Sequence, residues 1–418
     1  MWVIVMRIAE KAKATALGNH SIPVYNAAVT SPRVLYTAFD VVPGPKGAST
    51  HITHFVAGLV HAGYEVTLVT AGSDSLPEHG SYHGAALWRA PDDGDENYLK
   101  RALAFGDYVM AHVQGNPPYA VAHFRSIWSG FPLAETRHRH EYRLLYEVNG
   151  LPSIEMTYHY PGLQGARVVD KFKELEIATL HLADAVVCPS HVTRGYLVSL
   201  GIAPVKIAVI PNGVDTRAFQ NCRPAPERDG ALPTILYVGT LADWQGLGTL
   251  VEAMSLVRAE RPARLRILGH GRKRQRKLLE KQVRKLGVEG DVAVEAPVPH
   301  RLVPEAIAQA AVCVAPLGYN ERNVTQGCCP IKLLEYMACA RPIVASNLPV
   351  VRELVRPDVD ALLFRPDDPH DLARCLLSLL ADPALAARLG DSAAARARSE
   401  FTWRVAQQRL VEVYRRLS

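Results

Sequence analysis

Long hydrophobic runs are missing from this 418-residue sequence. A membrane-spanning helix needs about 18 or more consecutive apolar residues, and no stretch of the chain offers them. The apolar start, Met1 to Met6, is followed by charged residues instead of being preceded by them, which is the wrong order for a secretory signal peptide. We therefore expect residues 1–31 to form a poorly ordered extension of a cytoplasmic protein.

Paired cysteines and spaced metal ligands are missing as well. The seven cysteines are odd in number and include no C-x-x-C pair, which favours a reducing compartment. The histidines of Arg137-His138-Arg139-His140 have no spaced partners that could converge on a metal ion. Asp93-Gly94-Asp95 matches the D-x-D metal motif formally, but it follows no predicted strand. We expect no metal site and no cofactor.

What remains is the composition of a folded globular protein, with 48% apolar and 21% charged residues. The length is about twice what one hydrophobic core organises, which predicts two domains. The net charge is +6, and cations are concentrated between Arg258 and Lys285. Such a segment could face nucleic acid or an anionic membrane. Leu278, Leu279 and Val283 stand at helical spacing, however, and favour a surface helix with solvated charges. We expect no nucleic-acid partner.

Short apolar runs alternate with amphipathic segments, a pattern that predicts an α/β fold with parallel sheets. The first round of predicted strands is Val34–Phe39, Val66–Thr70, Tyr108–Val113, Leu144–Val148, Ala185–Cys188 and Ile207–Ile210. The second round is Ile235–Val238, Leu265–Leu268, Val292–Val294, Val312–Val314 and Ile343–Ala345. We predict two Rossmann-like domains, over 32–215 and 234–401, joined by a linker over 216–233, with the last helix, 402–418, crossing back to the first domain.

Two glycine-containing loops follow predicted strands and precede predicted helices. Gly44 and Gly47 would let backbone N–H groups approach an anion, although a tight surface turn explains them equally simply. Gly269 and Gly271 are followed by Arg272 at the start of the basic helix. Cations are unfavourable at a helix N-terminus, so a phosphate-facing role is one explanation of that arginine.

The segment Gly327–Ser346, GCCPIKLLEYMACARPIVAS, carries the most information. Pro330 suits the first turn of a helix and Pro342 follows its end. Lys332 and Glu335 are three residues apart and therefore neighbours on one face. A carboxylate there can accept hydrogen bonds from ribose hydroxyls and a lysine can neutralise phosphate. The alternative is a surface ion pair of little energetic value.

The order and content of these pieces resemble glycosyltransferase family 4, the retaining group with the GT-B fold of two Rossmann-like domains facing across a cleft. The resemblance rests on GPKGAST, LHLADAVVCPS, VIPNGVD, YVGTLADWQG, LGHG, KLLEYMACARPIVAS and the closing FTW, which span the chain from about residue 34 to its end. It implies transfer of a sugar, with retention of configuration and without a metal, from a nucleotide diphosphate sugar that is most often UDP-linked. The nucleotide would lie on the second domain and the acceptor on the first.

The resemblance also implies roles for individual residues. Glu335 would hold the ribose, and Gly47, Gly269 and Gly271 would contact base or phosphate. Leu333 is counted among the nucleotide-binding positions, although its side chain is expected to point into the core.

Several positions depart from the family pattern. Gly327 stands where the first glutamate of Glu-x7-Glu is expected, and Thr240 and Gln245, after Gly239, replace the phosphate-binding arginine and lysine. Lys332 is the first choice as replacement cation, with Arg272 or Arg322 in reserve. Asn149 replaces a histidine, and His112 matches another strand-end histidine of the first domain. His112 and Asn149 are the catalytic candidates.

These features predict transfer of a hexose, glucose in the first instance, from a UDP-sugar to a hydroxyl. The acceptor would be a polysaccharide or lipid-linked glycan, which suits peripheral association with the inner membrane face. A soluble sugar phosphate, as in sucrose-phosphate synthases of the same family, would instead suit a basic cluster of Arg137, Arg139 and Arg143. A sugar-nucleotide epimerase and a non-catalytic nucleotide-sugar-binding protein are the further alternatives.

Overall fold

The computed structural model describes residues 31–417 except 45, 93, 95–96 and 220–231. Most of the predicted extension (1–31) and of the predicted linker (216–233) lies outside the described residues, as do Asp93 and Asp95 of the D-x-D sequence. The remaining chain divides into two compact units. The first contains the described chain up to Cys188, then Arg194–Ile210 and the chain from Gln407 onwards. The second contains Pro189–Thr193 and Pro211–Ala406.

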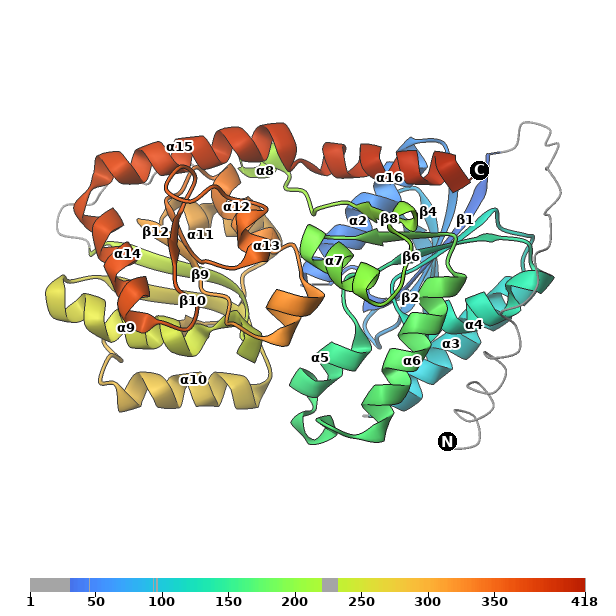
Figure 1. The fold of residues 1–418 in the computed structure, drawn as a ribbon, viewed down its shortest axis with the longest axis horizontal. Coiled ribbons are helices and arrows are strands. Elements are labelled where there is room, and N and C mark those ends of the chain that lie inside the picture. The colour runs from blue at the N-terminus through green and yellow to red at the C-terminus, as the bar shows by residue number, and fades with distance from the viewer. Residues whose placement is uncertain (1–30, 45, 93, 95–96, 220–231, 418) are drawn as a thin grey trace. The chain divides into compact units, whose positions relative to one another are not determined.

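The first unit is built on an eight-stranded sheet (Figure 1) in the order β3-β4-β2-β1-β5-β6-β7-β8. Its strands are β1 (Arg33–Val41), β2 (Glu65–Ala71), β3 (His79–Tyr82), β4 (Ala85–Ala90), β5 (Val121–Phe124), β6 (Arg143–Glu147), β7 (Ala185–Cys188) and β8 (Ile207–Val209). Neighbouring strands are parallel except β3, which runs antiparallel to β4. Central strands such as β1 are nearly continuous apolar runs because helices cover both faces.

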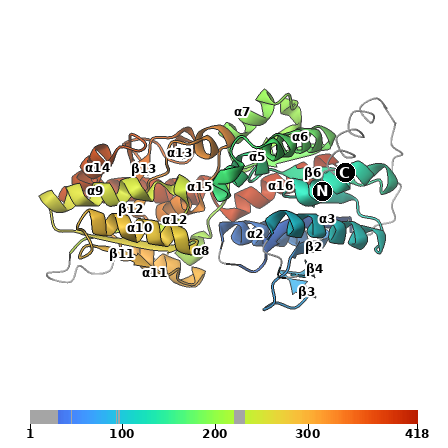
Figure 2. The same ribbon diagram turned by 90° about the horizontal axis from the view of Figure 1, so that it is seen from below.

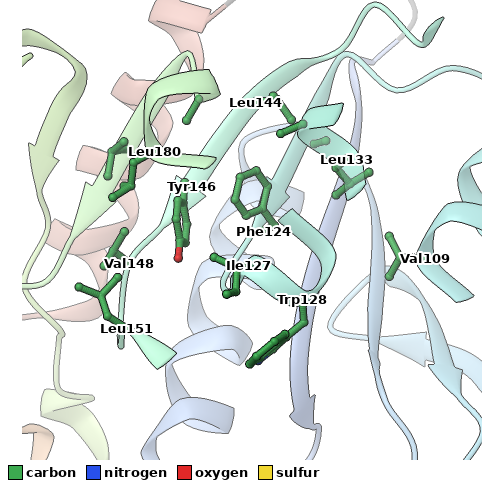
Figure 3. Close-up of a cluster of buried hydrophobic side chains, with 14 of the residues drawn as sticks. Val109, Phe124, Ile127, Trp128, Leu133, Leu144, Tyr146, Val148, Leu151 and Leu180 are labelled. Carbon is green, nitrogen blue, oxygen red and sulfur yellow. The ribbon is translucent and has the colours of Figure 1, made fainter. Parts of the chain in front are cut away.

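The helices of this unit are α2 (Gly47–His61), α3 (Tyr98–Gln114), α4 (Ile127–Thr136), α5 (Pro152–His159), α6 (Arg167–Leu182) and α7 (His191–Ser199), of which α7 begins in the second unit's segment. Side chains of α3, α4 and α6 share one buried cluster with the sheet, and Figure 3 shows Phe124, Trp128 and Tyr146 within it. The final helix, α16 (Trp403–Leu417), belongs to this unit from Gln407 onwards. Its Gln407 Nε2 donates to the carbonyl of His54 on α2 at 2.7 Å.

The predicted strand Tyr108–Val113 is wrong, because these residues form the last turns of α3. The run is apolar enough to resemble a buried strand when read alone. Phe105, Val109 and Val113 recur every four residues, however, and all three are buried in the same cluster, which is the helical period. Strands β3, β4 and β5 were not predicted.

The second unit contains a six-stranded, wholly parallel sheet in the order β11-β10-β9-β12-β13-β14. Its strands are β9 (Thr234–Thr240), β10 (Arg264–His270), β11 (Val292–Glu295), β12 (Val312–Ala315), β13 (Ile343–Ser346) and β14 (Leu362–Phe364). Its main helices are α9 (Leu247–Glu260), α10 (Lys273–Lys285), α11 (Val303–Ala308), α12 (Ile331–Ala338), α13 (Pro349–Arg352), α14 (Pro369–Ala381) and α15 (Pro383–Glu400). The predicted fold class, two Rossmann-like α/β domains, is confirmed.

Two hydrophobic clusters lie in this unit: α9, α10 and α14 contribute to one, and α11, α12 and α15 to the other. Figure 2 shows the same elements turned by a quarter circle. Residues 216–219, at the start of the predicted linker, form the short helix α8 (Thr216–Phe219). Phe219 is 2% exposed and packs into the second of these clusters, so the linker's first residues are anchored.

No helix in the described ranges is both long enough and apolar enough to cross a membrane. Five of the described cysteines are free thiols: Cys188, Cys313, Cys328, Cys329 and Cys375.

Candidate active site

Lys332 lies at the carboxyl edge of the second unit's sheet, which is the edge where the parallel strands end. It lies in the first turn of α12, and its Nζ donates to Tyr237 Oη at 2.7 Å and to Gln245 Oε1 at 2.6 Å. The ammonium also lies 4.1 Å from the centre of the Tyr237 ring. Tyr237 Oη donates in turn to the carbonyl of Thr240 at 2.6 Å. Gly239 lies against the same ammonium, since a Cβ added to it would be only 2.6 Å from Nζ. The structure therefore brings together four of the predicted donor-site positions, namely Gly239, Thr240, Gln245 and Lys332.

The electrostatic setting of this lysine is unusual. Both hydrogen-bond acceptors of its ammonium are neutral oxygens. The pKa of Lys332 is lowered to about 7, mainly by burial and to a smaller extent by the charge of Arg322, while Cys328 and Glu335 oppose the shift. Close to neutral pH the site therefore holds a cation that is easily lost unless an anion arrives to stabilise it.

Glu335 follows one turn later on α12, and its side chain is largely buried. Its Oε1 lies 3.0 Å from Nε2 of His300, in the 3₁₀ turn η5 (His300–Leu302). The hydrogen bond to this carboxylate is the main reason that the pKa of His300 is raised. Leu333 is fully buried in the core, so it could meet a ligand only through its backbone.

Gly269 and Gly271 are required by close packing between the ends of β9 and β10. A Cβ on Gly269 would lie 2.5 Å from the carbonyl oxygen of Gly239, and one on Gly271 would lie 2.6 Å from Cβ of Leu241. Arg272 is exposed directly before α10, where its backbone N–H donates to the Gln275 side chain. The glycine loop thus has a structural cause that holds with or without a ligand.

Gly327, at the position where the resemblance places the first glutamate of the pair, has a structural cause of its own. Its backbone has φ 79° and ψ 167°, a region that is essentially restricted to glycine. A Cβ there would lie 2.7 Å from the hydroxyl oxygens of both Ser190 and Thr193. The space for a larger side chain is occupied by the Pro189–Thr193 segment of the same unit.

Glu147 lies at the corresponding carboxyl edge of the first unit's sheet. It ends β6, is 1% exposed, and accepts hydrogen bonds from Tyr36 Oη at 2.6 Å and Arg125 Nε at 2.8 Å. Nε2 of His51 and Nε2 of His123 lie 2.9 and 3.1 Å from its carboxylate oxygens. Burial alone would raise the pKa of Glu147, but the positive charges of His51 and Arg125 hold the pKa well below its usual value.

Further residues near this edge are connected by hydrogen bonds to the buried network around Glu147. Asn149 Nδ2 donates to Glu147 Oε1. Arg125 Nη1 reaches Asp40 Oδ2 at 3.4 Å and the carbonyl of Ala48 at 3.5 Å. Because Ala48 lies in the first turn of α2 beside Gly47, one guanidinium connects the predicted phosphate loop to the buried carboxylate.

His112 is not at a strand end, and its prediction as a catalytic residue is wrong in its structural premise. It lies on α3, where its Nε2 is 3.0 Å from Tyr119 Oη and its ring is 5.2 Å from that of Trp88. Burial lowers its pKa, and so does the charge of Arg33, the first residue of β1. These neighbours place His112 at the amino edge of the sheet, opposite the edge at which such sheets bind ligands.

The predicted basic acceptor site is also at the amino edge. Arg137 donates to Leu182 O and to Asp184, and Arg143, the first residue of β6, lies 3.8 Å from the same carboxylate. Arg139 is exposed on the 3₁₀ turn η1 (Arg137–Arg139) and donates to the His138 ring. Asp184 directly precedes β7, so this cluster tethers strand starts to each other and does not line the carboxyl edge.

Sequence reasoning missed the residues that form the first unit's network, namely Tyr36, His51, His123, Arg125 and Glu147. Arg125 and Glu147 could have been recognised from the sequence, because each is a charged residue at the end of an apolar run. The strand before Arg125, only four residues long, was not predicted, and the pairing of the two charges depends on β5 lying beside β6.

Comparisons with known proteins agree with this architecture. Residues 45–218 match the family model for Glycosyltransferase Family 4, and residues 232–382 match that for Glycosyl transferases group 1. An uncharacterised glycosyltransferase of Methanocaldococcus jannaschii is 24% identical over 88% of this chain and 94% of its own.

Solved structures share the fold at low identity. Sucrose-phosphate synthase from Thermosynechococcus elongatus has a TM-score of 0.78 and 22% identity, covering 92% of this chain and 99% of the other. The Anabaena protein HepE, solved in complex with UDP-glucose, has a TM-score of 0.69 and 17% identity over 92% and 99%. The chain belongs to the family 4 type of glycosyltransferases with the GT-B fold, and it is a transferase.

Proposed function

We propose that this protein transfers a hexose, glucose in the first instance, from a UDP-sugar to a hydroxyl of a carbohydrate acceptor, with retention of configuration. The observation that carries the proposal is the cation at the second unit's edge. Lys332 Nζ lies 2.6 Å from Gln245 Oε1, and we infer that its charge takes the place of the lysine that the family pattern would have at position 245. The complex of HepE with UDP-glucose supports the choice of nucleotide.

In the proposed reaction Lys332 and the first-turn amides of α12 stabilise the negative charge that develops on the leaving diphosphate. As the bond between sugar C1 and the phosphate oxygen breaks, the acceptor oxygen forms a bond to C1 on the same face. The acceptor proton passes to the released phosphate oxygen. Glu335 would accept hydrogen bonds from the ribose hydroxyls. We further propose that the reaction needs no metal ion or cofactor and takes place in the cytoplasm, which the five free thiols favour.

A thermal-shift screen with nucleotides and nucleotide sugars tests the donor. A ligand present at a hundred times its dissociation constant adds about 2.7 kcal/mol to the free energy of unfolding. We expect UDP and UDP-glucose to stabilise the protein and UDP to be released when an acceptor is added. Stabilisation by another nucleotide alone would overturn the choice of UDP, and binding without turnover for any acceptor would favour a non-catalytic protein.

Transfer to a soluble sugar phosphate is a second candidate, because sucrose-phosphate synthase is among the most similar folds. The basic cluster that first suggested it lies at the wrong edge of the sheet. An epimerase would need an acid and a base at the first unit's carboxyl edge, and the buried Glu147 is already held by its cationic partners.

A further inference from the structure

Helix α10, the basic helix of the second unit, has no part in the proposed donor chemistry. It is an outer helix of that unit and packs beside α9 (Figures 1 and 2). Leu279 and Val283 bury one side of it in the hydrophobic cluster that it shares with α9. Gln282 Nε2 donates to the carbonyl of Gly248 on α9 at 3.1 Å. These contacts determine which side of α10 faces outward.

Six cations occupy the outward side of α10. All six are exposed, and at about 100° per residue their positions fall within an arc of about 120° on a helix about 20 Å long. Glu280, the one acidic residue of α10, lies outside this arc, 3.6 Å from Arg276. We call the six residues the cationic face; they are Lys273, Arg274, Lys277, Lys281, Arg284 and Lys285.

The acidic residues near α10 are paired with other cations. Asp291 lies 2.9 Å from Arg258, and Glu295 lies 2.7 Å from Arg266. Glu289 lies beyond the end of the helix, where it can balance the charge of one cation at most. Among the residues that the structure describes, no member of the cationic face forms an ion pair. Its charge is therefore left for solvent or for a partner to balance.

The requirements of folding do not explain this arrangement. The four lysines of the face follow one another at four-residue spacing, at which like charges on a helix destabilise it. The first two cations also stand in the first turn, where the helix dipole disfavours positive charge. On α6, in contrast, Lys171 is compensated by Glu174 at 2.6 Å. An anionic partner that covers the cationic face would remove the repulsion between its charges.

The composition of the face favours a bilayer over a nucleic acid as that partner. Four of the six cations are lysines, which are hydrated point charges on flexible stems and suit a diffuse anionic surface, whereas the planar fork of arginine suits directed contacts. Residues 258–295 include no phenylalanine, tyrosine or tryptophan on which bases could stack. Leu278, at the edge of the face, is 54% exposed, and an apolar side chain beside cations is typical of helices that lie in a membrane interface.

We propose that the cationic face of α10 is a docking surface for a bilayer that contains anionic lipids. The helix lies parallel to the membrane plane, the headgroups balance its six cations, and Leu278 enters the headgroup region. Each cation near the surface adds to the attraction. The inference goes beyond the proposed function, because it requires neither the sugar donor nor the acceptor. It places the membrane contact on the unit that carries Lys332.

Sedimentation of the full chain with lipid vesicles tests this docking surface. Phosphatidylcholine vesicles are compared with vesicles that contain about 30% phosphatidylglycerol, at about 0.1 M salt, where the Debye length is about 10 Å. We expect the anionic vesicles to bind the protein at least tenfold more tightly than the neutral ones, and binding to be lost at about 1 M salt. Equal binding to both kinds of vesicle, or binding to neither, would overturn the proposal.

Paired neutralisations locate the surface. Lys277→Gln combined with Lys281→Gln should weaken binding to the anionic vesicles about 25-fold, because each cation near a membrane contributes about fivefold. Arg404→Gln combined with Arg409→Gln changes the net charge equally at two exposed positions of α16. This control should weaken binding no more than about twofold, because charges away from the contact are screened. Equal losses in the two double variants would mean that net charge alone matters and would refute the docking surface.

Two further measurements separate this proposal from its alternatives. Fluorescence anisotropy with single-stranded and double-stranded RNA is carried out at the same salt concentration. Tighter binding to RNA than to anionic vesicles, lost in the Lys277→Gln/Lys281→Gln variant, would make the face a nucleic-acid site and overturn the proposal. The stabilisation by UDP should be the same in this variant as in the unmodified protein. Loss of vesicle binding with UDP binding intact would thus leave the donor proposal standing, and the reverse result would leave the docking surface standing.

Discussion

Glu147 and Lys332 are both ionisable groups at the carboxyl edge of a parallel sheet, but the protein treats their charges in opposite ways. Glu147 is surrounded by Arg125, two histidines and a tyrosine, so its charge is compensated within the fold. Lys332 has only neutral acceptors for its ammonium, and burial depresses its pKa to about 7. The first arrangement builds a rigid support, and the second leaves a charge to be balanced by a ligand.

The largest effect is expected from breaking the compensated site. Arg125→Met removes the cation beside a carboxylate that stays buried, and removal of one partner of a buried ion pair costs about 3–5 kcal/mol. Urea denaturation followed by circular dichroism measures the loss. Arg137→Met, which breaks a partly exposed pair with Asp184, should cost no more than about 1 kcal/mol. Equal losses would mean that burial of the Glu147 network adds nothing.

Removal of the uncompensated charge should affect binding instead of folding. Lys332→Ala is expected to weaken UDP about a hundredfold, roughly 2.7 kcal/mol, while uridine, which lacks phosphates, binds as before. Titration calorimetry with both ligands gives the comparison, and Lys281→Ala on the exposed face of α10 is the matched control. If UDP and uridine weakened by the same factor, the phosphate role of Lys332 would be refuted.

A substitution at Gly327 tests whether this position of the second unit can carry a side chain. Gly327→Ala combines a backbone conformation reserved for glycine with a 2.7 Å contact to Ser190 and Thr193, and we expect a loss of about 2–3 kcal/mol. Gly287 has φ +65°, and a Cβ added there would meet nothing within 4 Å, so Gly287→Ala measures backbone strain alone, about 1 kcal/mol. Equal thermal midpoints for the two variants would show that the Pro189–Thr193 segment yields easily.

The smallest expected effect is a pH dependence of donor binding. The free site loses the Lys332 proton as pH rises through about 7, whereas bound diphosphate favours the charged form and raises that pKa. UDP affinity should therefore fall roughly tenfold between pH 7 and 8.5, with close to one proton taken up per UDP at pH 8. Calorimetry in buffers of different ionisation enthalpy measures the uptake. Lys332→Arg, always charged, should bind without it, and an identical uptake in that variant would contradict the assignment.

The sequence predicted the arrangement of residues at the second unit's candidate site better than at the first unit's. The reason is the separation along the sequence of the residues that have to meet. Lys332 and Glu335 lie on one helix, so their common face follows from helical spacing. The network around Glu147 joins β1, α2, β5 and β6, and its residues meet only through the strand order. His112 was misplaced because a short apolar run fits both a strand and a buried helix.

The departures from the family pattern were visible in the sequence, but their compensation was not. Thr240 and Gln245 could be recognised as missing cations. That Lys332 Nζ lies within hydrogen-bonding distance of Gln245 depends on the packing of α12 against β9, to which Tyr336 Oη contributes through its contact with the Val238 N–H at 2.8 Å. Similarly, the glycine at 327 could be read as an absence, whereas only the structure shows the hydroxyls that occupy its place.

Helix α16 also has a consequence for how the molecule is made. Tyr414 Oη lies 2.9 Å from Nδ1 of His123, whose other ring nitrogen faces Glu147. During synthesis, residues 211–406 leave the ribosome before that tyrosine does, so the first unit cannot finish its own interior until the whole of the second has been translated. A chain that ended after the second unit would therefore lack the Tyr414 contact with His123 and would leave the interior of the first unit incomplete.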